Sequence, residues 1–94
     1  MRVEGDALVL EGALTLTSVS GFAGAVRDRL KQGAHVIDFR GVTEVDSAAV
    51  ALALEWLRQA AESGSALRFT NLPGAMQDLA KLYGVSELLQ SASS

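Results

Sequence analysis

Cysteine is absent from the 94-residue chain, and proline and histidine each occur only once. The lack of cysteine excludes disulfides, thiolate nucleophiles and cysteine-based metal sites, and it fits a cytoplasmic protein. A chain this short buries only about two thirds of its unfolded surface, which leaves no material for a second core. We therefore expect residues 1–94 to form one domain.

The chain also has little net charge, no cluster of basic residues and no long apolar run. The formal net charge is −3, and the lysines and arginines are scattered, so no basic stripe exists to bind a nucleic acid. The longest apolar run, Ala48 to Leu54, is far shorter than the roughly 20 residues that span a bilayer. The first residues, MRVEGDALVLEG, lack the pattern of a signal peptide. We expect no nucleic-acid partner and no direct membrane insertion, so a location at the inner face of the membrane would depend on another protein.

Motifs for catalysis, cofactors and metals are missing as well. No phosphate-binding or dinucleotide-binding glycine motif occurs, and His, Asp and Glu do not repeat at ligand spacings. Asp38 lies inside an apolar strand, where a carboxylate usually accepts backbone N–H groups. The lone histidine, His35, begins that strand and should lie about 15 Å from Ser47 at 3.3 Å per residue, which argues against a Ser-His pair. We expect no enzyme, cofactor or metal site, and a small hydrolase or ligand carrier that uses Ser47 is the weakest reading.

The spacing of apolar residues predicts the order of the elements. Apolar residues three and four apart predict helices, and short β-branched or aromatic runs between glycines predict strands. These are strands at 1–4 and 7–12, a helix at 18–32, a strand at 35–39, a loop at 41–45, a helix at 47–63, a strand at 66–70, a helix from Pro73 to Gly84, a short helix at 85–90 and a frayed tail at 91–94. The order ββαβαβα(α) indicates an α/β fold with a small mixed sheet and helices mainly on one face.

The most informative stretch is the junction at Asp46 and Ser47, where an apolar strand leads into an alanine-rich helix. Either residue can cap the helix by accepting a hydrogen bond from its first turn, which is worth about 1 kcal/mol. At about 100° per residue, one stripe of the helix faces the core, and Leu52 and Trp56 fall outside it. The stripe consists of Val50, Leu54, Leu57 and Ala61, with Ala53 and Ala60 beside it.

The first turns of this helix therefore show water a small, uncharged surface made by Ser47, Ala48, Ala51 and Leu52. Such a surface suits close approach by another protein, and the helix N-terminus suits a phosphate on Ser47. Alternatively, the alanines only raise helix propensity, and the large apolar residues pack under neighbouring helices. Single aromatic residues such as Trp56 and Tyr83 belong more often to a core than to a site, so Trp56 is a minor interface candidate.

The same residues resemble a known family. Asp46-Ser47, the small residues after it, "NLPGAM" and "LAKLYGVSELL" resemble the STAS domains of anti-sigma factor antagonists over nearly the whole chain. Within that family, the "LAKLY" segment is similar to the STAS subunits of Mla phospholipid-transport ABC systems. The resemblance implies a non-catalytic module that docks the start of this helix on the cytoplasmic ATPase subunit and supports its activity.

The contact would comprise Asp46, Ser47, Ala48, Ala51, Leu52 and Glu55. In the wider family the residue matching Ser47 is phosphorylated by a partner kinase, so the alternative is an anti-sigma factor antagonist with Ser47 as candidate phosphoacceptor and an anti-sigma kinase as partner. Family members usually have glycine at the place of Ala49 and sometimes at that of Ala48. An added methyl group should crowd a kinase active site but leave room for a static interface.

Overall fold

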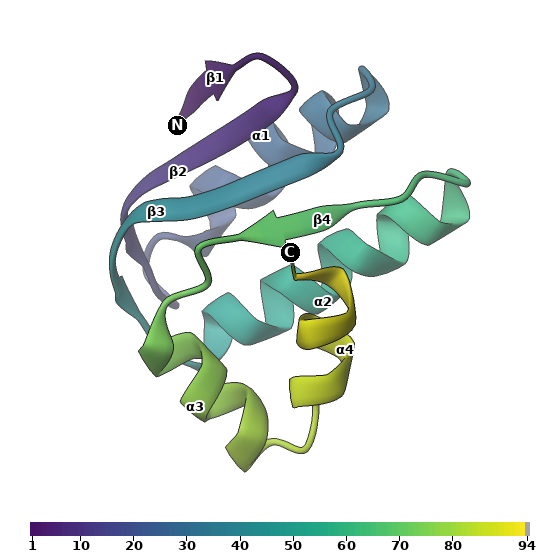
Figure 1. Cartoon of the computed structure of the whole chain (residues 1–94). Coiled ribbons are helices and arrows are strands. Elements are labelled where there is room, and N and C mark those ends of the chain that lie inside the picture. Colours follow the sequence, from purple (N-terminus) through teal and green to yellow (C-terminus); the bar gives the residue numbers. More distant parts are fainter. Residues whose placement is uncertain (94) are drawn as a thin grey trace.

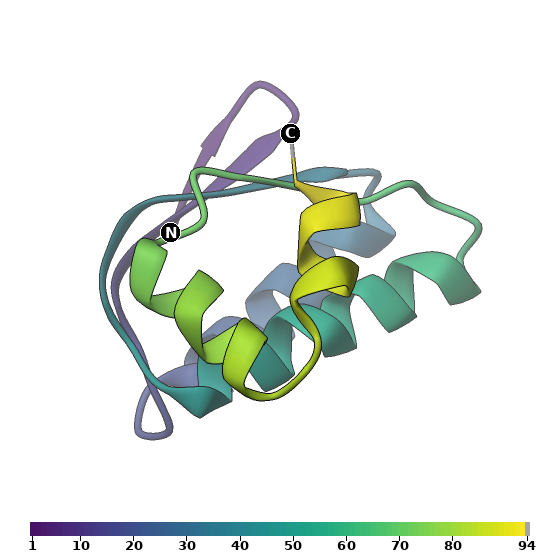
Figure 2. The ribbon, with the colours of Figure 1, turned by 60° about the horizontal axis from the view of Figure 1, so that its bottom comes forward.

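A four-stranded sheet forms one layer of the molecule, and the helices cover one of its faces (Figure 1). The computed structural model describes residues 1–93. The strands are β1 (Arg2–Glu4), β2 (Ala7–Leu14), β3 (Val36–Val45) and β4 (Arg68–Thr70). The helices are α1 (Val19–Lys31), α2 (Ser47–Glu62), α3 (Gly74–Leu82) and α4 (Ser86–Ala92). Figure 2 shows the helices together beneath the sheet, which confirms the predicted α/β fold.

The strands lie in the order β1-β2-β3-β4. β1 and β2 pair antiparallel through a turn in which Gly5 has a φ of +61°, a value that glycine adopts without steric cost. β2 pairs parallel with β3, and β3 pairs parallel with β4. The sheet is therefore mixed, as the order of elements predicts, and the carboxyl ends of β2 and β3 meet at one edge.

The third strand is twice as long as predicted, because the expected loop at 41–45 continues it. The register shifts between the pairs Val9 with Asp38 and Glu11 with Gly41, so β3 carries one extra residue there. A Cβ atom on Gly41 would lie 2.6 Å from the carbonyl oxygen of Leu10, and only glycine tolerates this approach. The predicted loop is therefore wrong, because Gly41 permits a β-bulge within the strand and does not end it.

Helix α2 buries only part of the predicted core face, because Val50, Ala53 and Ala60 are buried as predicted but the buried face is turned toward Trp56. Trp56 is 0% exposed, whereas Ala61 is exposed and Leu54 is only half-buried. The helix lies between α1 on one side and α3 and α4 on the other, so its flanks are covered as well. Its buried residues are Ala49, Val50, Ala53, Trp56 and Ala60. Small side chains let the helix approach the sheet, and Trp56 is a core residue rather than an interface candidate.

The C-terminal segment is better ordered than predicted. Pro73 is the N-cap of α3 rather than its first residue. α4 extends to Ala92, which is buried, and Ser93 forms an isolated parallel bridge with Phe69 of β4. Residues 91–93 are thus part of the fold and not a frayed tail, because the apolar side of α4 packs against the core, while Ser94 lies outside the described residues.

Candidate protein-docking site at the start of α2

Asp46 ties two segments of the chain together at the start of α2. Its Oδ1 accepts a hydrogen bond from the Ala48 N–H at 2.9 Å, which caps the helix. Its Oδ2 accepts from the backbone N–H of Leu16 at 3.0 Å. The predicted cap is therefore confirmed and assigned to Asp46, but the same carboxylate also holds the β2–α1 loop against the helix. That second contact joins residues thirty positions apart and could not be read from the sequence.

The β2–α1 loop is fixed by its own hydroxyl groups. The Ser18 hydroxyl donates to the Ala13 carbonyl oxygen at 2.8 Å and accepts from the Thr15 N–H at 2.9 Å. The Thr15 and Thr17 hydroxyls lie 3.1 Å apart and share a hydrogen bond. Leu16, at the tip of this loop, is 76% exposed. The loop thus holds a large apolar side chain in water beside the start of α2.

Ser47 is exposed, and its hydroxyl makes no hydrogen bond within residues 1–93. It follows the cap residue directly, so it stands at the end of the helix where N–H groups and the helix dipole favour negative charge. Among its predicted neighbours, Ala51 is exposed, while Ala48 and Leu52 are half-buried, Leu52 against the core. The helix tip therefore offers a free hydroxyl within a small-residue surface.

Glu55, one turn further along α2, is engaged by the chain itself. Both its carboxylate oxygens contact the Arg58 guanidinium, which also pairs with Glu62. The hydrogen bond from Arg58 lowers the pKa of Glu55, and the same contact raises the pKa of Arg58. Glu55 thus marks the point where the small-residue surface ends and a paired, charged surface begins.

Ala49 does not face the helix tip at all. It is 0% exposed and belongs to the core. The expectation that its methyl group would crowd a partner at this position is therefore wrong, because the methyl group is packed within the core and is not exposed to solvent. The presence of alanine in place of the family glycine carries no steric consequence for what docks on Ser47.

Two shallow hollows lie on either side of the helix tip and share Ala48 and Ala51. The first, of about 520 Å³, runs between the tip and the corner where α3 leads into α4. The second, of about 300 Å³, runs between the tip and the start of α1. The first is lined by Leu16, Asp46, Ser47, Ala48, Val50, Ala51, Leu54, Tyr83 and Val85. The second is lined by Val19, Ser20, Ala23, Ala48, Ala51, Leu52 and Glu55. Together the two hollows make one mainly apolar surface centred on α2.

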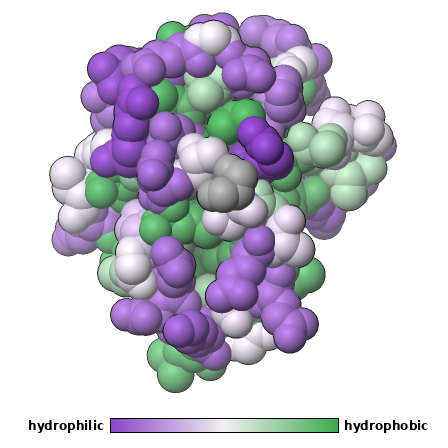
Figure 3. Space-filling view, viewed as in Figure 1, coloured by the Kyte–Doolittle hydropathy of each residue, from purple (hydrophilic) through white to green (hydrophobic). Residues whose placement is uncertain are grey.

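Sequence reasoning missed the parts of this surface that other elements contribute. Tyr83 is 52% exposed and lines the larger hollow, although the sequence favours a core position for it. Figure 3 shows a hydrophobic group at the lower end of the molecule. Leu82, the last residue of α3, is 75% exposed but lines neither hollow. The available signal was the apolar Leu16 between two threonines and the Leu82-Tyr83 pair before Gly84, since both place large side chains at element ends.

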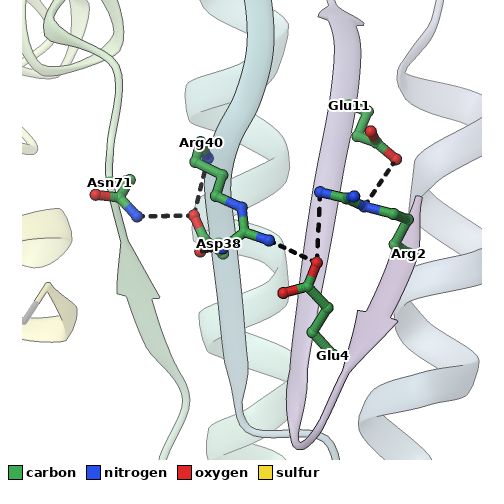
Figure 4. Close-up of polar contacts among 6 residues, drawn as sticks. All are labelled: Arg2, Glu4, Glu11, Asp38, Arg40 and Asn71. Atoms are coloured by element: carbon green, nitrogen blue, oxygen red, sulfur yellow. Dashed lines mark hydrogen bonds and ion pairs between the residues drawn. The ribbon is translucent and has the colours of Figure 1, made fainter.

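The helix-free face of the sheet carries polar side chains that pair with one another (Figure 4). Asp38 is 8% exposed and accepts hydrogen bonds from the Arg40 N–H at 2.9 Å and from Asn71 Nδ2 at 3.0 Å. Arg40 in turn donates to Glu4 at 2.5 Å, and this hydrogen bond raises the pKa of Arg40. Asp38 therefore finds the backbone partner that the sequence predicts.

His35 lies at the opposite end of β3 from Ser47. Its Nε2 is 2.9 Å from the Asp6 carboxylate. The intervening strand of ten residues spans roughly 30 Å at 3.3 Å per residue, which is longer than the sequence predicted. Residues 1–93 contain no group of three acidic, histidine or cysteine side chains placed to hold a metal. None of their helices is long and apolar enough to cross a bilayer.

Comparison with solved structures shows the fold. The anti-sigma factor antagonist SpoIIAA in its unphosphorylated form matches with a TM-score of 0.63 and 21% identity, over 87% of this chain and 79% of that chain. A candidate anti-sigma factor antagonist from Thermotoga maritima matches with a TM-score of 0.68 and 17% identity, over 97% and 91% of the two chains. A sulfate transporter family protein from Wolinella succinogenes matches with a TM-score of 0.67 and 16% identity, over 99% and 80%.

Comparison with protein-family models shows the family to which the chain belongs. No curated protein matches the sequence significantly. The family model described as "Mlab, STAS domain" matches residues 1–90. STAS domains are in general non-catalytic modules that bind other proteins, such as kinases or transporter components. Because this model covers nearly the whole sequence and the fold agrees with it, the chain belongs to the Mlab-type STAS domain family.

Proposed function

We propose that the protein is a non-catalytic accessory subunit that binds and supports the cytoplasmic ATPase of an Mla-type ABC phospholipid transport system. The observation that carries this proposal is the free Ser47 hydroxyl at an uncharged helix tip between two mainly apolar hollows. A contiguous apolar surface bordered by charged residues is typical of protein interfaces. In this proposal the contact comprises Asp46, Ser47, Ala48, Ala51, Leu52 and Glu55, and the subunit works at the inner face of the membrane through the ATPase.

The match to the Mlab-type family model supports the transport setting. The geometry supports docking by a flat, static contact, since Ala48 and Ala51 project little and the two hollows on either side of them accept side chains from a partner. A single hydroxyl at the centre of such a surface supplies one hydrogen bond and leaves no room for a larger side chain. Substitution of Ser47 is therefore the direct test.

The test is co-purification of the Ser47→Arg variant with the ATPase subunit encoded in the same genome beside an Mla-type permease. We expect the variant to fold normally, because Ser47 is exposed, and to lose at least about 30-fold in affinity, as a central contact of an interface does. Ser65→Arg is the matched control, since Ser65 is exposed beyond the far end of α2. Undiminished binding by Ser47→Arg would refute the proposed docking site, and failure of the wild type to bind would refute the proposed function.

A second candidate is an anti-sigma factor antagonist that an anti-sigma kinase phosphorylates on Ser47. It is favoured by the exposed, unpaired hydroxyl and by the absence of any obstacle from Ala49, which points into the core. A phosphate there would add a charge of about −1.5 to −2 beside Asp46 and weaken an apolar contact. Intact-mass measurement of the protein isolated from its own cells distinguishes the two, because only the switch predicts a phosphorylated fraction that Ser47→Ala removes.

A further inference from the structure

Leu16 is the most exposed large apolar side chain within residues 1–93, at 76%. Exposure of a leucine alone has no significance, since single apolar residues are common on surfaces. Leu16, however, lines the larger hollow together with Ser47 and Tyr83, so it is continuous with the small-residue tip of α2. Leu82 is almost equally exposed, at 75%, but it lines neither hollow. The two leucines are thus almost equally exposed, but only Leu16 borders the surface at the start of α2.

The position of Leu16 is fixed before any partner arrives. Its backbone N–H donates to Asp46 Oδ2 at 3.0 Å, and the loop around it is held by the Ser18 hydroxyl. A side chain presented by a pre-ordered backbone loses less conformational entropy on binding than one on a free loop. Asp46 therefore does more than cap α2, because it sets the distance between Leu16 and the helix tip.

The surface also limits the chemistry of what can cover it. The charged residues that line the two hollows, Asp46 and Glu55, are both carboxylates, and no lysine or arginine lines either hollow. The other lining residues are apolar or carry a hydroxyl group. Glu55 is already paired with Arg58, whereas Asp46 accepts only backbone N–H groups and forms no ion pair within residues 1–93. An apolar partner segment that places a lysine or arginine beside Asp46 matches this surface in both hydrophobicity and charge.

We infer that Leu16 is the principal anchor of the interface, inserting into an apolar pocket on the ATPase subunit, and that Asp46 is the residue that positions it. The segment of the ATPase that surrounds this pocket is apolar and places a lysine or arginine beside Asp46, and it fills the hollow between Leu16 and Tyr83. This inference rests on the proposed function, since it names the anchor and the partner chemistry of the same site.

The decisive measurement is the affinity of the Leu16→Asp and Leu82→Asp variants for the ATPase subunit, by titration calorimetry. We expect Leu16→Asp to weaken binding at least about 30-fold and Leu82→Asp to leave it within about twofold, because buried apolar anchors dominate interface energy. Thermal unfolding of both variants checks folding, and Leu16→Ala, with a loss of roughly tenfold, serves if the aspartate disturbs the loop. Equal effects of the two aspartates would overturn the inference.

The role of Asp46 is separated from its capping role by Asp46→Asn. An asparagine oxygen can still cap the Ala48 N–H, but the remaining amide nitrogen is a donor and cannot accept from the Leu16 N–H. We expect Asp46→Asn to speed amide hydrogen exchange at Leu16 and to weaken binding several-fold, and to have little further effect in the Leu16→Ala background. Strict additivity of the two substitutions would contradict a positioning role.

The basic residue beside Asp46 is tested by the salt dependence of binding. We expect the affinity of the wild type to fall as salt rises and that of Asp46→Asn to change less, because added salt screens an interaction between charges at the rim of an interface. The comparison in the Leu16→Ala background is therefore made at high salt. An equal salt dependence of the two proteins would show that the partner segment is not basic beside Asp46.

The two levels of the proposal fail in different ways. If the wild type itself does not bind the ATPase subunit, the proposed function fails. If the wild type binds and Ser47→Arg binds equally well, the docking site at the start of α2 is wrong. If Ser47→Arg abolishes binding while Leu16→Asp binds like the wild type, the site stands and only the assignment of Leu16 is wrong.

Discussion

The helix-free face of the sheet and the start of α2 both lie open to solvent, but they are built in opposite ways. On the sheet, Arg2, Glu4, Arg40 and Asp38 form a continuous chain of ion pairs and hydrogen bonds (Figure 4). At the start of α2, the Asp46 carboxylate is occupied by backbone N–H groups of its own chain, Glu55 at the border is paired with Arg58, and the rest is apolar or small.

This difference shows why exposure alone does not identify an interface. A partner that covered the sheet face would have to remove water from several charged groups that already satisfy one another, and this desolvation is costly. A partner at the start of α2 would displace water mainly from apolar surface, which is favourable. Paired charges thus disfavour association at the helix-free face of the sheet, whereas the apolar surface at the start of α2 favours it.

The largest expected effect concerns Gly41, in the bulge that carries β3 from the charged face to the helix tip. Gly41→Ala should lower the free energy of unfolding by about 2–3 kcal/mol, because the new methyl group meets backbone at 2.6 Å and cannot be relieved by a side-chain rotation. Urea denaturation measures this. Gly24→Ala is the control, since its methyl group would meet only the Arg27 side chain at 3.9 Å, and we expect it to leave stability equal or higher.

Introducing a charged residue at the helix tip tests the difference between the apolar helix tip and the charged face of the sheet. Ala51→Arg should weaken binding of the ATPase subunit by about 2 kcal/mol, or roughly 30-fold, while changing the free energy of unfolding by less than about 0.5 kcal/mol. Removal of charge from the sheet face by Arg40→Ala should leave that affinity unchanged. Calorimetric titration of both variants checks this, and a loss of affinity in Arg40→Ala would place the interface on the sheet instead.

Breaking the polar chain of the sheet face should affect stability and not binding. Asp38→Ala leaves the Asn71 amide and the Arg40 N–H without their acceptor, and we expect a loss of about 1–2 kcal/mol in the free energy of unfolding. Denaturant titration measures the loss, and the affinity for the ATPase subunit provides the internal control. A fully stable Asp38→Ala variant would show that water replaces the carboxylate without cost.

The smallest effect concerns pH at the boundary of the docking surface. The hydrogen bond from Arg58 lowers the pKa of Glu55 below its ordinary value of 4.5. The ionised pair therefore contributes stability above that value, and the contribution is lost as the pH falls through the lowered pKa. We expect the difference in melting temperature between the wild type and Glu55→Gln to be small at pH 7 and to vanish in acid. A difference that persists in strong acid would assign the effect to packing.

Much of the architecture could be predicted because it follows from local pattern. Helices were found from apolar spacing and stop signals, and the mixed sheet followed from their alternation with strands. The wrong predictions concern residues whose type is compatible with two different local structures. Gly41 could mark a turn or a bulge, and only the pairing of β3 with β2 decides between them. The predicted position of Trp56 is wrong because α2 is flanked by α1, α3 and α4, so it buries a wider sector than the one stripe that its leucines indicate.

By itself, the sequence determined the order of the elements, the cap at the start of α2 and the small, uncharged character of the helix tip. Only the tertiary structure decided what surrounds that tip. Leu16 and Tyr83 are far from Ser47 along the chain, and they line one hollow with it for two reasons. The parallel pairing of β2 with β3 brings the β2–α1 loop to the start of α2, and the packing of α3 against α2 brings the α3–α4 corner there. A surface made of three separate segments has no local pattern in the sequence.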